Sequence, residues 1–175
     1  QALQDFGIPG NDVQRWMKDW KVRHDFLAPG DYRALSVAML STHDTTNWAA
    51  WWENEAGTID EGLFRRKCAE RGIDYNYIKE KLFDFTRSRH GRLRWLNSVT
   101  SGDVLAAILG KRREEIADFI EMYENTYKEK ERLWRILKIS GPMQENANRK
   151  AISAVLKMTL ESKAIFCIHL ILDWL

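Results

Sequence analysis

The chain has 175 residues, of which 45% are hydrophobic and 30% are charged, a balance typical of a globular protein that can bury a core. Its formal net charge is only +2, so total charge provides no argument for binding a nucleic acid or an anionic membrane. The length corresponds to one ordinary domain or to a piece of a larger one.

The first quarter of the chain is predicted to contain a helix, a turn and two strands. Residues 1–7 indicate the end of a helix, with Gly7 as its C-terminal stop, and Ile8-Pro9-Gly10 indicates a turn. Residues 13–16 then form a short predicted strand. Residues 35–41 are a second apolar run that hardly alternates, as expected for a strand buried on both faces.

Helices are predicted for most of the remaining chain, followed by a last strand. The predicted helices cover residues 47–53, 58–72, 75–89, 101–109, 113–137 and 145–161. The apolar run 164–172 is a third strand candidate. Strands separated by helical crossovers are typical of a parallel sheet, so we predict an α/β fold.

A polar cluster follows the second predicted strand directly. The run from Leu35 ends at Ser41-Thr42-His43-Asp44-Thr45-Thr46, and polar side chains at the carboxyl ends of parallel strands face the ligand crevice. His43 and Asp44 are therefore candidate site residues. A structural alternative stays open, in which Thr42 or Asp44 caps the next helix and His43 is an ordinary core histidine.

The two cysteines and the apolar runs bear on the compartment. Cys68 and Cys167 lie in apolar contexts without metal-ligand spacing, so we expect reduced, buried thiols in a cytoplasmic protein. We see no signal peptide, and the longest apolar run, residues 164–172, is too short to span a membrane. No metal and no cofactor is expected, because the four histidines share no ligand spacing such as HExxH.

The chain is too short for a complete barrel of parallel strands. A three-stranded parallel sheet has two exposed edges, whereas such strands are normally covered, and a complete (β/α)8 TIM barrel takes roughly 250 residues. We therefore expect residues 1–175 to be part of a larger barrel.

Several motifs resemble the 4-α-glucanotransferases, also called amylomaltases or disproportionating enzymes, which form family 77 of the glycoside hydrolases. They are Phe6-Gly7-Ile8-Pro9-Gly10, Val13-Gln14-Arg15-Trp16, Ser36-Val37-Ala38, Ser41-Thr42-His43-Asp44-Thr45, Trp51-Trp52 and the stretch from Ser162-Lys163-Ala164-Ile165-Phe166 to Asp173. The resemblance implies that residues 1–175 are the C-terminal part of a single catalytic barrel domain, containing its last three strands. Residues 60–140 would be a mostly helical insertion between strands seven and eight.

The resemblance also implies a reaction and a role for each candidate residue. Family members transfer α-1,4-linked glucan segments between maltooligosaccharide acceptors with retention. Asp44 matches the family's third catalytic carboxylate, which braces the sugar ring, and His43 matches a substrate-binding histidine beside it. We expect buried, rigid groups here, since fixed donors and acceptors stabilise developing charge without reorganising.

The covalent machinery of the family has no counterpart here. Retaining chemistry needs a nucleophilic carboxylate and a carboxylic acid, and the resemblance places both before the Phe6-Gly7-Ile8-Pro9-Gly10 motif. The sequence also departs from the family at Met17, where relatives often have an acidic residue, and at Leu172, where a Gln is expected. Glu53 and Glu55 follow the Trp51-Trp52 pair, and we expect them to face solvent rather than to replace the missing groups.

We therefore expect a fragment that is inactive alone and whose partners are α-1,4-glucans and the remainder of its own barrel. Most of the eight tryptophans are expected in the core, and a few could stack on sugar rings. An alternative of another class is a free-standing helical protein-interaction module with a structural His-Asp pair. A metal hydrolase is a third, weaker interpretation.

Overall fold

A computed structural model describes residues 5–20, 22–23 and 25–174. The chain divides into two compact units, of which unit 1 comprises residues 1–53 and 130–175 and unit 2 comprises residues 54–129. The predicted helix over residues 1–7 lies largely outside the described residues. In the described part of the chain, no helix is both long and apolar enough to cross a membrane.

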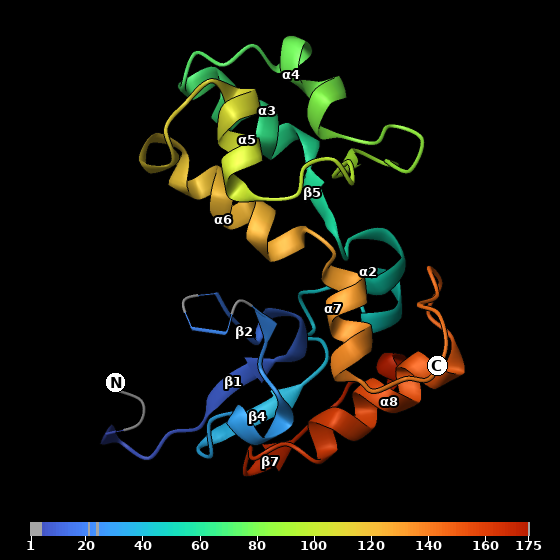
Figure 1. Ribbon diagram of the computed structural model, residues 1–175. Coiled ribbons are helices and arrows are strands. Elements are labelled where there is room, and N and C mark those ends of the chain that lie inside the picture. Colours follow the sequence, from blue (N-terminus) through green and yellow to red (C-terminus); the bar gives the residue numbers. More distant parts are fainter. Residues whose placement is uncertain (1–4, 21, 24, 175) are drawn as a thin grey trace. The chain divides into compact units, whose positions relative to one another are not determined.

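Unit 1 contains the predicted parallel sheet. Strands β1 (Gly10–Val13), β4 (Ser36–Met39) and β7 (Phe166–Cys167) lie in the order β1-β4-β7, and both pairings are parallel. Gly10 is opposite Ser36 and Val37 is opposite Phe166. Figure 1 shows the three strands side by side with helix α8 next to them. The parallel α/β arrangement expected from the sequence is confirmed.

The predicted bounds of these strands need correction. β1 begins at Gly10, and Gln14–Trp16 forms a 3-10 turn instead of a strand. β4 is not buried on both faces, because its burial alternates between buried Ser36 and Ala38 and their half-buried neighbours. β7 has two residues rather than nine, since the pairing with β4 ends at Cys167.

In the described part of unit 1, helices and a small hairpin accompany the sheet. They are α2 (Trp48–Asn54), α7 (Glu129–Ile136), α8 (Arg149–Leu160) and the antiparallel pair β2 (Lys18–Asp19) and β3 (Asp25–Phe26). Aromatic packing joins α2 to α7, with the Trp48 and Trp52 rings stacked 5.2 Å apart and Trp134 6.1 Å from Trp52. The buried Lys130 ammonium lies over the Trp52 ring and pairs with Glu145 at 2.9 Å.

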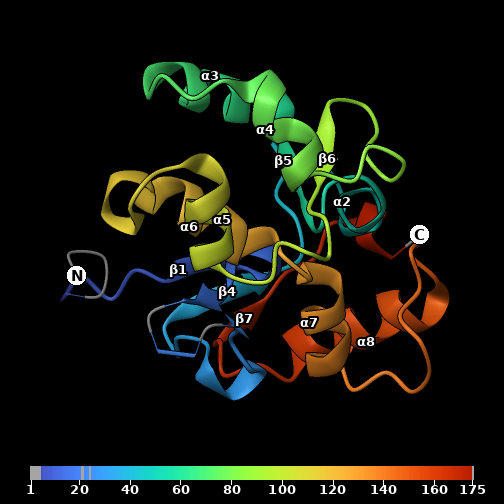
Figure 2. The same ribbon diagram turned by 45° about the horizontal axis from the view of Figure 1, so that its top comes forward.

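Unit 2 is mostly helical and contains one antiparallel strand pair, β5 (Thr58–Asp60) with β6 (Arg92–Arg94), among its described elements; both strands are labelled in Figure 2. Its other elements are α3 (Glu61–Glu70), α4 (Tyr75–Leu82), α5 (Gly102–Leu109), a 3-10 turn (Arg113–Ile116) and α6 (Ala117–Thr126). Asp60, Asp74 and Ser101 cap the starts of α3, α4 and α5 with their side chains. The β5–β6 pair was not predicted from the sequence.

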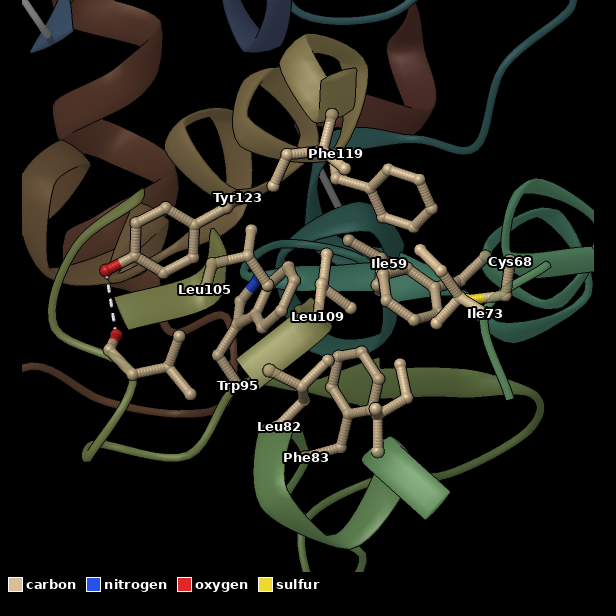
Figure 3. Packing of buried hydrophobic residues seen from close by; sticks show 14 of the residues in the cluster. Ile59, Cys68, Ile73, Leu82, Phe83, Trp95, Leu105, Leu109, Phe119 and Tyr123 are labelled. Carbon is tan, nitrogen blue, oxygen red and sulfur yellow. Dashed lines mark hydrogen bonds between the residues drawn. The ribbon is translucent and has the colours of Figure 1, made fainter. Parts of the chain in front are cut away.

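The core of unit 2 is aromatic and centred on Phe64. The Phe64 side chain is fully buried, and its ring meets those of Tyr75, Phe83, Trp95 and Phe119 edge-on at 5.0–6.3 Å between centroids. Figure 3 shows the surrounding cluster, including the hydrogen bond from the Tyr123 hydroxyl to the Val99 carbonyl, which measures 2.8 Å.

The single long helix predicted over residues 113–137 is wrong. The segment consists of the 3-10 turn, α6 and α7, with Lys128 in a left-handed conformation (φ 50°) between the two helices. Its apolar side chains are divided between two cores. Phe119 and Tyr123 pack in the core of unit 2. Trp134 packs against Trp52 in unit 1. No Gly or Pro marks the interruption. The predicted helix 75–89 likewise stops at Leu82, where the chain turns into an extended bridge with Trp95.

Candidate functional site

The candidate site lies at the carboxyl edge of the three-stranded sheet. Parallel strands end on the same side, so the segments after β1, β4 and β7 come together there. β4 continues into buried Leu40 and Ser41, and the chain then turns outward before α2 begins at Trp48. Residues 42–47 form this turn, which we call the His-Asp loop.

His43 and Asp44 occupy the exposed tip of the His-Asp loop. Their side chains are 87% and 79% exposed, and His43 Nε2 lies 3.1 Å from Asp44 Oδ2. The loop closes on itself, because the Thr45 amide and hydroxyl both donate to the Thr42 carbonyl at 3.1 Å. The expectation of buried groups is therefore wrong for these two side chains in this chain, since the turn carries them away from the sheet.

A buried polar network lies beneath the loop and links it to both neighbouring strands. Asp173, which follows β7, accepts hydrogen bonds at Oδ1 from the Ser41 hydroxyl and the Trp48 amide, both at 2.8 Å. Arg15, which follows β1, donates to the Ser41 hydroxyl at 3.1 Å and to the Thr46 carbonyl at 2.7 Å. Because Arg15, Ser41 and Asp173 are all buried, the network clamps the loop at both ends.

The start of α2 shows which residue caps it. Asn47 Oδ1 accepts from the Ala50 amide at 2.8 Å, and the Asn47 carbonyl accepts from the Trp51 amide at 3.0 Å. Asn47 is thus the N-cap residue. The alternative in which Thr42 or Asp44 caps this helix is wrong, and the exposed His43 is not a core histidine.

Sequence reasoning missed the network. Asp173 and Ser41 are 132 residues apart, and Arg15 and Ser41 are 26 apart, so no local pattern connects them. One signal was present, namely a charged residue at the end of the apolar run 164–172. A charge in such a position is seldom buried without partners, which would have marked Asp173 as structurally important.

A second polar cluster ties β7 to α8. His169 Nε2 lies 2.7 Å from the Thr159 hydroxyl and 3.4 Å from Cys167 Sγ. Burial lowers the pKa of His169, partly offset by the negative charge of Asp173, and burial raises the pKa of the Cys167 thiol. Both groups are therefore kept neutral, which suits a packing contact and not an activated thiolate.

The remaining candidate residues are Glu53, Glu55 and His24. Glu53 is exposed and accepts a hydrogen bond from the Ala147 amide at 3.0 Å, while Glu55 is half-buried, not solvent-facing as expected. His24 lies outside the described residues. Among the residues that the structure describes, no three His, Cys, Asp or Glu side chains gather as metal ligands.

Comparison with known proteins identifies the family. The model of the glycoside hydrolase 77 family, described as 4-alpha-glucanotransferase, matches residues 1–175. The chain belongs to this family. It is also similar to 4-alpha-glucanotransferases of Chlamydia pneumoniae (42% identity over 53 residues) and Chlamydia caviae (39% over 54 residues). These matches cover 30% and 31% of the chain, and only 10% of each relative.

Removing the Asp173 carboxylate is expected to loosen the buried network beneath the His-Asp loop. In Asp173→Ala the Trp48 amide loses its buried acceptor, and each such loss costs about 1–3 kcal/mol. Asp173→Asn keeps one acceptor oxygen and is expected to cost less. The free energy of unfolding in urea measures both. Asp31→Ala, which breaks only the exposed pair with Arg23, is the control, expected near 0–1 kcal/mol. Equal losses in Asp173→Ala and Asp31→Ala would show that the network carries no stability.

Proposed function

We propose that this chain is the C-terminal part of the barrel of a retaining 4-alpha-glucanotransferase, in which Asp44 and His43 hold one glucose unit of an α-1,4-glucan. The observation that carries the proposal is the His-Asp loop, which presents an exposed carboxylate and imidazole from a clamped turn at the carboxyl edge of a parallel sheet. Membership of the family supports the reaction class.

The proposed roles follow from the chemistry of retention. In the first step, a nucleophilic carboxylate displaces the leaving sugar, whose glycosidic oxygen is protonated by the acid, and forms a glycosyl intermediate. In the second step, the same acid group acts as base and takes the proton of the acceptor hydroxyl, which displaces the carboxylate. Both steps pass through an oxocarbenium-like transition state. Asp44 would accept hydrogen bonds from sugar hydroxyls and stabilise the positive charge that develops on the ring. His43, 3.1 Å from Asp44, would orient that carboxylate and contact the same sugar. The nucleophile and the acid/base would come from earlier strands, which this chain does not supply.

The sheet edges support a larger barrel as the partner. β1 and β7 each pair only with β4 within the described residues. Exposed apolar side chains flank both edges and include Phe6, Ile8, Ile165, Phe166, Ile168, Ile171 and Leu172. Unpaired edges with apolar surroundings normally mark interaction surfaces. We propose that the earlier strands of a (β/α)8 barrel cover them, with unit 2 as the helical insertion predicted over residues 60–140. A cytoplasmic location remains part of this proposal, since both cysteines are free thiols.

The chain alone is expected to have no transferase activity. Incubation with maltotriose should release no glucose and form no longer dextrins, because Asp44 lacks its two catalytic partners. Chromatography of the products checks this, and robust disproportionation would contradict the proposal. Calorimetric titration with maltooligosaccharides separates it from the interaction-module alternative, which instead requires stabilisation by a protein partner and no response to glucans.

A further inference from the structure

Two tryptophan side chains in unit 1 are exposed to a degree unusual for this residue. Trp16 is 61% exposed and Trp174 is 56% exposed. Five of the eight tryptophans in the chain are instead buried. Tryptophan carries a large apolar surface that is normally covered in a core or an interface. An exposed indole offers a flat apolar face that a ligand can cover.

Each exposed tryptophan directly follows a buried charged residue of the network. Arg15 precedes Trp16, and Asp173 precedes Trp174. Arg15 bonds the Thr46 carbonyl and the Ser41 hydroxyl, and Asp173 bonds the same hydroxyl. The network thus ties the residue before each tryptophan to the ends of the His-Asp loop.

The segments that carry the two tryptophans follow the strands on either side of β4. Trp16 ends the 3-10 turn after β1, and Trp174 follows the 3-10 turn Ile171–Asp173 after β7. Because β4 is the central strand of the sheet, the loop that follows it is flanked by the segments that carry the two indoles. Trp174 is further held by an edge-on contact with the His169 ring at 5.9 Å.

We propose that Trp16 and Trp174 are stacking platforms for the glucose units on either side of the unit held by His43 and Asp44. This inference rests on the proposed function and adds the neighbouring binding positions. The apolar face of a sugar ring packs against a flat aromatic face, while its hydroxyl rim remains available for polar groups. Such a surface would select an α-1,4-glucan of at least three units over single glucose.

Fluorine NMR of the full 175-residue chain labelled with 5-fluorotryptophan tests the proposal. Trp16→Phe and Trp174→Phe assign the two signals, and the probe is maltoheptaose, with the β-linked cellopentaose as control. We expect saturable shifts of the Trp16 and Trp174 signals with maltoheptaose alone. The signals of Trp48 and Trp52, which are buried, should stay in place.

Substitutions give an independent measurement. Trp16→Ala and Trp174→Ala are each expected to weaken maltoheptaose binding roughly tenfold, and the Phe variants should recover part of the loss because they keep a flat ring. Trp16→Leu and Trp174→Leu should not recover it, which separates stacking from simple apolar bulk. Tyr77→Ala, which removes an exposed aromatic ring from unit 2, is the matched control and should bind normally.

The outcomes separate this inference from the proposed function. The His43 imidazole is followed by its own proton signals in the same titration. If maltoheptaose shifts these signals but neither indole fluorine signal, the assignment of the stacking platforms is wrong and the proposed function stands. If it shifts neither the imidazole nor the indoles, the glucan site itself is wrong. Equal indole shifts with cellopentaose would mean unselective apolar contact and would overturn the inference.

Discussion

Asp44→Asn in a complete 4-alpha-glucanotransferase that contains this chain is expected to lower kcat roughly 100- to 1,000-fold, the usual cost of removing one fixed polar group from a transition-state site. The amide keeps the shape of the side chain but loses the negative charge that would stabilise an oxocarbenium-like ring. KM should change far less than kcat, because the lost interaction strengthens mainly in the transition state. Steady-state disproportionation of maltotriose measures both constants.

The same substitution should leave the fold intact. The Asp44 side chain is 79% exposed and touches only His43 among the contacts described, and surface changes of this kind usually alter stability by no more than about 0.5 kcal/mol. Asp103→Asn is the matched control, since Asp103 is 76% exposed and also holds one close ion pair, with Arg113 at 2.9 Å. Near-normal turnover of Asp44→Asn, or an equal loss in Asp103→Asn, would refute the role of Asp44.

Phe64→Ala is expected to destabilise unit 2 by about 3–5 kcal/mol. Phe64 is fully buried and its ring contacts four other aromatic rings of the unit, so truncation leaves a cavity that rigid rings cannot easily fill. Urea unfolding measures the loss, and hydrogen exchange of the amides in residues 54–129 locates it.

The preceding residue offers a control for this prediction on the same helix. Leu63 is also apolar but is 38% exposed, so Leu63→Ala should cost well under half as much, because fewer of its contacts are lost. Equal costs for the two variants would show that the aromatic cluster is not the centre of the unit.

Local sequence patterns predicted the helices of this chain better than its strands. The helix start at Ser101 depends on a side chain that bonds an amide three residues away, and a pattern of that range is visible in the sequence. The start predicted at Thr58 is wrong, because residues 58–60 form β5 and Asp60 caps α3 instead. The β5–β6 pair joins Thr58 to Arg94, a separation at which no turn signal links the partners. The length of β7 was also unpredictable, because it depends on how far β4 can pair with it.

The same contrast between local and long-range features holds for the candidate site. The family and the positions of His43 and Asp44 could be recognised from contiguous motifs. The loop that holds the two residues is also local, since bonds between Thr42 and Thr45 close it. Their exposure was not predictable, since it depends on the direction in which the loop leaves the sheet.

Contacts between distant segments were decided by the tertiary structure alone. The bond between Ser41 and Asp173 spans 132 residues, and the break at Lys128 divides one apolar stripe between two cores. Sequence periodicity reports which side of a helix or strand is apolar, but not which partner will cover it. The packing of the whole chain makes that choice, because burial and hydrogen bonding are satisfied between segments that only the fold brings together.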